Sequence, residues 1–151
     1  GKTPPRDTDN TSGILHLSSD WILISDLEHN FSFPIHIAQT QLRPDIVIYS
    51  RNLKRVVLIE LTCPCEENME SWHQTKLNKY APLVKVIKSN KWKVDLFGIE
   101  IGARRYSSNT VSVCLRRLGF TNTLLRNTIK QLGRISMECS FSIWLCRNYK
   151  E

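Results

Sequence analysis

Two β-rich runs joined by a short polar turn constrain the fold of this chain more than any other feature. The first run, IVIY, follows Asp45, and the second, VVLIELT, begins at Val56. Because the turn between them is polar, the two runs predict a β-hairpin. The second run is almost continuously apolar, which is typical of a central strand covered on both faces.

A single carboxylate interrupts the second run. Glu60 would be costly to bury in such a strand unless it were paired or bound a metal. Antiparallel pairing brings Asp45, at the start of the first strand, beside Glu60, near the end of the second. Two carboxylates at one end of a sheet make a hard-oxygen site suited to Mg²⁺ or Mn²⁺, which also engages phosphate.

The remaining patterns predict an α/β fold, with a mixed central β-sheet flanked by helices. Residues 1–13 read as a polar lead-in, and residues 14–151 as a single domain whose residues 106–151 form a helical C-terminal extension. Pro82 is expected to kink or divide its helix, and Gly119 and Gly133 to interrupt the extension. The expected elements are strand or irregular pieces at 14–38, a helix from 66 to about 88, a strand at 92–101, and helices at about 107–119 and 122–148.

The charge balance favours a polyanionic partner. The chain has 21 Lys and Arg against 14 Asp and Glu, a formal net charge of +7, and each Lys or Arg that meets a phosphate also releases a condensed counterion. No apolar run approaches the roughly 20 residues that a membrane span needs, so no membrane is expected. The odd number of cysteines and the lack of a signal peptide predict reduced thiols in an intracellular compartment.

Three motifs follow one another along the chain: Arg43-Pro44-Asp45, then Glu60-Leu61-Thr62 after fourteen residues, then Lys76-x-x-Lys79-Tyr80. Their arrangement resembles the PD-(D/E)XK nuclease superfamily. More narrowly, it is similar to the restriction-like endonuclease domains of non-LTR retrotransposons and to related animal genomic sequences. The resemblance runs from about Trp21 through Leu118 and is strongest in LRPDIVIYS, VVLIELTCPCEENME, KLNKYAPL and FGIEIGAR.

This resemblance implies a restriction-endonuclease-like core and a metal-dependent endonuclease that hydrolyses phosphodiester bonds in duplex or branched DNA. It implies that Asp45 and Glu60 hold Mg²⁺ or Mn²⁺, with the backbone carbonyl of Leu61 as a third ligand. Because there is one such site per chain, cutting both strands would take a homodimer or two nicking events. A DNA partner also implies a nuclear or otherwise intracellular location.

Thr62 departs from the family pattern, in which a lysine orients or activates the attacking water and offsets developing charge. Lys76 or Lys79 could supply that lysine from the following helix. Spacing favours Lys76, which shares a helix face with Trp72 and Tyr80, and we expect Tyr80 and Trp72 to brace this helix against the sheet. Two alternatives stay open: a decayed site on a fold that binds DNA without cutting it, and a scaffold that binds another protein.

Several other charged residues have both a functional and an ordinary reading. Arg43, Arg104 and Arg105 are candidate DNA contacts, while Glu100 is expected at the surface more than toward the site. Asp26 or Glu28 could supply a further acidic ligand, which is the less favoured reading. The basic residues of the C-terminal helices fit either a DNA-facing surface or solvated helix faces: Arg116, Arg117, Arg126, Lys130, Arg134, Arg147 and Lys150.

A zinc site is the weaker interpretation of the cysteines. Cys63 and Cys65 are spaced C-x-C, and no second pair follows at a standard interval, even with His73 nearby. Cys139 and Cys146 lie far away in a predicted helix. We therefore expect these thiols to be buried rather than to bind metal.

Overall fold

The computed structural model describes residues 13–25, 31–62, 69–101 and 109–148, with the backbone alone at 69–73, 76, 147 and 148. The described residues form one four-stranded sheet in the order β1-β2-β3-β4. Its first two pairs are antiparallel and its last is parallel, so the sheet is mixed and the α/β class is confirmed. The strands are β1 (Ile22–Ser25), β2 (Ile46–Ser50), β3 (Arg55–Thr62) and β4 (Lys93–Glu100).

The predicted hairpin is the β2–β3 pair. Its register runs from Ser50 opposite Arg55 to Ile46 opposite Ile59, and the turn contains Lys54 with a positive φ of 47°. β3 lies between β2 and β4, and its residues 56–60 are all buried. An apolar run is therefore required on both faces of this strand, as its sequence indicated.

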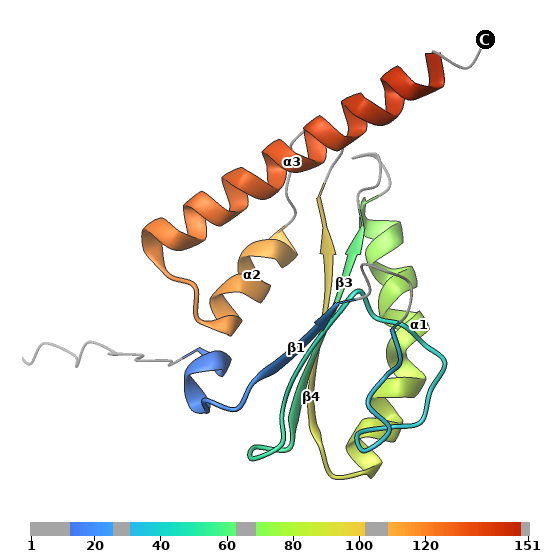
Figure 1. Cartoon of the computed structure of the whole chain (residues 1–151), viewed down its shortest axis with the longest axis vertical. Helices are drawn as coiled ribbons and strands as arrows, with labels where there is room; N and C mark the ends of the chain where they lie inside the picture. The colour runs from blue at the N-terminus through green and yellow to red at the C-terminus, as the bar shows by residue number, and fades with distance from the viewer. Residues whose placement is uncertain (1–12, 26–30, 63–68, 102–108, 149–151) are drawn as a thin grey trace, which may run out of the picture.

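Helices cover both faces of the sheet (Figure 1). α1 (Met69–Ser89) packs through Tyr80, Leu83 and Ile87 on the same core as Val56 and Leu58. The other side chains of β3 point to a second core, formed with α2 (Asn109–Leu118). Alternate residues of one strand thus supply two cores. The long α3 (Asn122–Asn148) and the short 3-10 helix η1 (Ile14–Leu17) complete this second side.

Pro82 and Gly133 do not end their helices. Pro82 lies inside α1, which continues to Ser89, and its exposed ring leaves the buried face of the helix unbroken. Gly133 likewise lies within α3. Gly119 does end a helix: its φ is +117°, and the N–H of Phe120 donates to the carbonyl of Leu115 at 2.9 Å, as in a helix C-terminus closed by a left-handed glycine.

The C-terminal half of α3 extends beyond the body of the molecule (Figure 1). Phe141, Ile143 and Trp144 are 59%, 58% and 57% exposed, and the rings of Phe141 and Trp144 stack with their centroids 5.9 Å apart. Cys139 and Cys146 are exposed here too, so the expectation that these two thiols are buried was wrong. None of the described helices combines the length and apolar character that crossing a membrane requires.

Candidate functional site

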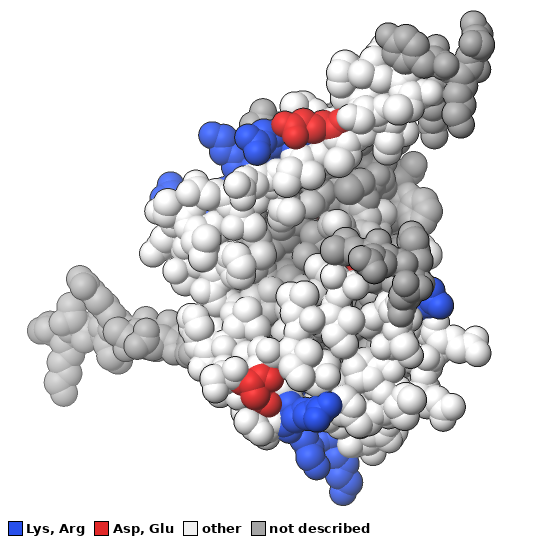
Figure 2. Space-filling model, in the orientation of Figure 1, with Lys and Arg blue, Asp and Glu red and all other residues white. Residues whose placement is uncertain are grey.

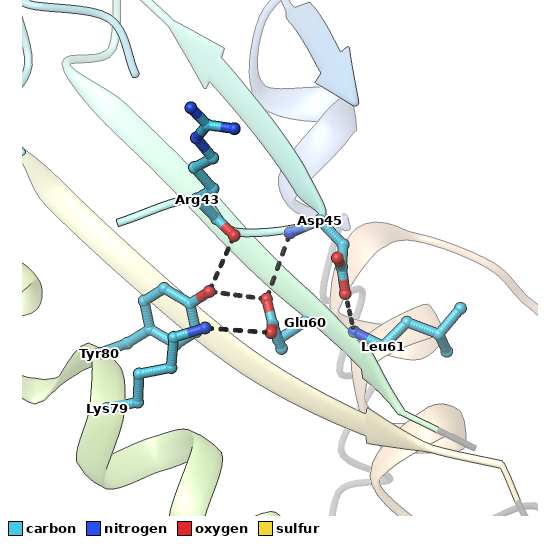
Figure 3. Close-up of polar contacts among 6 residues, drawn as sticks. All are labelled: Arg43, Asp45, Glu60, Leu61, Lys79 and Tyr80. Carbon is cyan, nitrogen blue, oxygen red and sulfur yellow. Dashed lines mark hydrogen bonds and ion pairs between the residues drawn. The ribbon is translucent and has the colours of Figure 1, made fainter. Parts of the chain in front are cut away.

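Asp45 and Glu60 meet at the open end of the β2–β3 hairpin, as Figure 3 shows. The last strand pair is Ile46 opposite Ile59, so the next residue on each side is one of the two acids. The backbone N–H of Asp45 donates to Glu60 Oε2 at 3.2 Å, and the N–H of Leu61 donates to Asp45 Oδ2 at 2.7 Å. The juxtaposition predicted from the hairpin is therefore present, and each carboxylate is held by backbone of the opposite strand.

Glu60 is a buried carboxylate with hydrogen-bond and ion-pair partners. Only 4% of the residue is exposed. The Tyr80 hydroxyl lies 2.8 Å from Glu60 Oε2 and 3.0 Å from the carbonyl oxygen of Arg43, and Lys79 Nζ lies 3.6 Å from Glu60 Oε1. A phenol has one proton, so Tyr80 donates to either oxygen or shares the proton between them. These contacts offset the desolvation cost that a buried carboxylate carries.

Tyr80 connects the carboxylates to the core. It is fully buried, and burial, followed by the hydrogen bond and the negative charge of Glu60, raises the pKa of the Tyr80 phenol above its ordinary value. The phenol therefore remains protonated at physiological pH and stays a hydrogen-bond donor. The expectation that Tyr80 braces α1 against the sheet agrees with these contacts.

The two candidate lysines differ in what the structure describes. The Lys79 ammonium reaches Glu60 and lies 4.8 Å from the centroid of the Tyr80 ring. Its side chain is 45% exposed, so it borders both the buried carboxylate and solvent. Lys76 lies in α1, but its side chain is outside the described residues, as are those of Met69 and Trp72. The preference for Lys76 thus stays a prediction, and the described contact belongs to Lys79.

The carboxylate pair, Lys79 and Tyr80 together form the candidate site of this chain. No family model, curated protein or solved structure matches the chain. What the site can do chemically follows from its donor atoms.

The donor set fits a hard divalent cation. Within the described residues, no three His, Cys, Asp or Glu side chains gather as a metal site. Mg²⁺ does not need three, because it commonly keeps several waters and uses one or two carboxylates together with substrate phosphate. Asp45 and Glu60 supply carboxylate oxygens at one sheet end, and the carbonyl of Leu61, which the family resemblance implied, follows directly on the strand.

Thr62 lies at the end of β3, at the position where the family resemblance implied a lysine. Its hydroxyl oxygen is buried and, among the described residues, has no hydrogen-bond partner. A buried polar atom without a partner is uncommon in folded proteins. In the parallel register Thr62 lies opposite Glu100 on β4.

Glu100 is buried, so its expected surface position was wrong. It is 2% exposed, and the hydroxyl of Thr110 donates to its Oε2 at 3.0 Å. The reason is tertiary: the first turn of α2 returns to the end of β4 and supplies a donor there. The alternation of polar and apolar residues along β4 does not predict that α2 buries Glu100.

The predicted DNA contacts are only partly described. Arg43 contributes its backbone carbonyl to the site, while its guanidinium points away from the two carboxylates in Figure 3. Arg104 and Arg105 lie outside the described residues, and so do Asp26, Glu28, Cys63 and Cys65. The side chain of His73 is not described either, so these roles stay predictions.

Proposed function

We propose that this chain is a divalent-metal-dependent DNA endonuclease with a PD-(D/E)XK-type core, of the kind found in non-LTR retrotransposons. The observation that carries the proposal is the buried carboxylate of Glu60, paired across the hairpin with Asp45. The order hairpin, helix, parallel strand (β2, β3, α1, β4) supports a restriction-endonuclease-like core. The basic net charge of +7 suits the substrate.

In this proposal Asp45, Glu60 and the carbonyl of Leu61 hold Mg²⁺ or Mn²⁺. Bound there, the cation supplies Lewis acidity and lowers the pKa of water next to it. Water attacks phosphorus and the bond from phosphorus to the leaving oxygen breaks; the attacking water loses a proton and the leaving oxygen gains one. Lys79 or Lys76 orients the attacking water and offsets the developing charge.

Tyr80 is a positioning residue in this proposal. Its hydroxyl lies between Glu60 Oε2 and the Arg43 carbonyl, so it fixes the carboxylate relative to the segment that carries Asp45. It does not need to touch substrate to do this. A protonated phenol serves this purpose, because it stabilises the carboxylate without competing for the cation.

Cleavage of end-labelled duplex, single-stranded and branched DNA in Mn²⁺ and in Mg²⁺ tests the proposal. The native chain should cut at least one of them, EDTA should stop the reaction, and Glu60→Gln and Asp45→Asn should each lose roughly 100-fold or more of the rate, as for loss of a principal charge-stabilising group. Gln and Asn keep the shape of the side chains, and circular dichroism verifies that both variants are folded. If both variants cut and bind Mn²⁺ as the native chain does, the site assignment is wrong.

The second candidate is a nuclease fold that binds DNA without cutting it. The absence of the motif lysine at Thr62 favours this version, as does the hydroxyl in its place, which has no hydrogen-bond partner among the described residues. Such a protein would retain salt-sensitive DNA affinity in EDTA and show no cleavage in Mn²⁺. If the first candidate is correct, double-strand cleavage still requires a homodimer or two nicking events.

A further inference from the structure

An open pocket of about 430 Å³ lies where α2 passes into α3. It is separate from the carboxylate pair, because Glu60 contacts α1 whereas α2 and α3 form part of the other core. None of the described residues that line it is acidic. They come from the end of α2, the connecting turn and the start of α3: Arg116, Phe120, Thr121, Asn122, Leu125 and Arg126.

The two arginines of this pocket differ from comparable arginines on the same two helices. Arg117 lies beside Arg116 in sequence, and its Nε is 4.0 Å from an oxygen of Asp95. Further along α3, Arg134 pairs with Glu138 at 3.6 Å. Within the part of the chain that the structure describes, Arg116 and Arg126 form no such ion pair. Two guanidinium groups without an ion-pair partner among the described residues therefore border one pocket.

The pocket is built on a fixed turn. Gly119 takes a positive φ of 117°, and both its N–H and that of Phe120 donate to the carbonyl of Leu115. Leu125 is only 7% exposed and Phe120 packs against the same core. The spacing between the two arginine-bearing helices is thereby set before any ligand arrives, which reduces the entropy cost of binding.

Figure 2 shows that the described Lys and Arg side chains on the face in view form separate groups, some beside an acidic side chain. A basic group with an acidic neighbour is partly neutralised, so it attracts an anion less strongly. The Arg116–Arg126 pocket combines positive charge, concavity and a lining without a described acid. That combination matches a phosphate, which guanidinium groups recognise through paired N–H donors.

We infer that this pocket binds a backbone phosphate of DNA, with Arg116 and Arg126 as the contacting cations. The choice of DNA as the polyanion rests on the proposed function, whereas phosphate recognition rests on the pocket. Binding here needs no metal and does not use Asp45 or Glu60. The pocket therefore contributes substrate affinity independently of the cleavage step.

The test is the salt dependence of DNA affinity, measured by fluorescence anisotropy with a short labelled duplex in EDTA. Arg116→Gln/Arg126→Gln is compared with Arg117→Gln/Arg134→Gln, which removes the same charge from the same two helices. Each lost phosphate contact flattens the plot of log affinity against log salt by about 0.9, so the pocket variant, which loses the one phosphate held by both arginines, should lose about 0.9 from its slope. The control variant should keep the native slope, and circular dichroism verifies that both are folded.

Equal loss of slope in the two double variants would overturn the inference, because affinity would then follow net charge rather than this pocket. A native chain without salt-sensitive binding would overturn it as well. Glu60→Gln alters the proposed cleavage site but not the pocket, so in the same assay it should keep the native slope. The pocket and the nuclease proposal can therefore fail separately. If the native chain binds through Arg116 and Arg126 but cuts nothing in Mn²⁺, the pocket is upheld and the nuclease proposal fails.

Discussion

At the scale of single residues, Tyr80 shows how one side chain can serve the core and the candidate site together. Its ring belongs to the core under α1, while its hydroxyl lies between Glu60 and the Arg43 carbonyl. A phenylalanine would fill the same space but remove the hydroxyl that contacts these two oxygens. The contribution of the buried ring to stability can therefore be separated from the contribution of the hydroxyl contacts at this position.

Tyr80→Phe should lower the free energy of unfolding by about 1–3 kcal/mol, because it removes a buried donor to a carboxylate. It should also weaken Mn²⁺ binding about tenfold if Tyr80 orients Glu60 as a ligand. Urea unfolding and titration with Mn²⁺ measure the two effects. Tyr49→Phe, at another buried tyrosine, is the matched control, and equal effects of both substitutions on Mn²⁺ binding would contradict a positioning role.

Asp20 is a second residue whose environment has a measurable consequence. Hydrogen bonds from the Ser18 hydroxyl, then the Ser50 hydroxyl, then the Asn52 N–H hold the pKa of Asp20 well below its ordinary value of 3.8. A carboxyl group whose pKa is depressed by folding stabilises the fold above its unfolded pKa, and that stabilisation is lost as pH falls toward the folded value.

Asp20→Asn should therefore flatten the dependence of stability on pH below about pH 4, where the native carboxylate begins to lose its advantage over the unfolded chain. Urea midpoints measured between neutral pH and strongly acidic pH give this dependence. The native chain should lose more stability than the variant over the acidic part of the range. Parallel curves for the two proteins would rule out a contribution from Asp20.

At the scale of elements, η1 packs closely against the turn that ends α2. A Cβ placed on Gly13 would lie 2.0 Å from Gly119 Cα and 2.6 Å from the Leu118 carbonyl oxygen. Gly119 itself has a φ of +117°, a conformation that L side chains rarely adopt. The two glycines thus allow two backbone segments far apart in sequence to lie side by side.

Gly13→Ala should lower the free energy of unfolding by at least about 1–3 kcal/mol, since backbone atoms on both sides must move to admit the methyl group. Urea unfolding of the variant measures the loss. Ser19→Ala, at an exposed position shortly after η1, is the control and should change stability by less than about 0.5 kcal/mol. A similarly small effect at Gly13 would mean that the close approach is absent in solution.

α3 shows why helix periodicity alone does not predict burial. Its first half places Leu125, Ile129 and Leu132 against the second core. Large apolar residues continue in the second half with Phe141, Ile143 and Trp144, yet those side chains are more than half exposed. Local sequence predicts the helix and the position of its apolar residues. Which of these residues are buried depends on how far the rest of the domain extends along the helix.

At the scale of the whole molecule, the sheet separates two chemical environments. The α1 side holds Glu60, Tyr80 and Lys79, and the other side holds the α2–α3 pocket with its two arginines. Adjacent residues of β3 face opposite sides, so one strand contributes the site carboxylate to one side and Ile59 to the other. If both proposals hold, metal chemistry and part of the DNA affinity occupy different sides of one sheet.

The hairpin and the Asp45–Glu60 pair could be predicted from sequence because both depend on local order. A short polar turn determines the register, and the register brings the two acids to the same strand end. The inward position of Tyr80 also follows from helical spacing. The sequence by itself therefore determined the α/β class, the order of the main elements and the two acids of the candidate site.

Only the tertiary structure decided which polar groups are buried and which of them have hydrogen-bond or ion-pair partners. Glu100 is buried because the start of α2 returns to the end of β4, and Arg116 and Arg126 share a pocket because Gly119 turns the chain between their helices. Pro82 and Gly133 remain within helices that continue past them. The physical reason is that burial and charge pairing depend on residues distant in sequence, whereas strand register and helix faces depend on near neighbours.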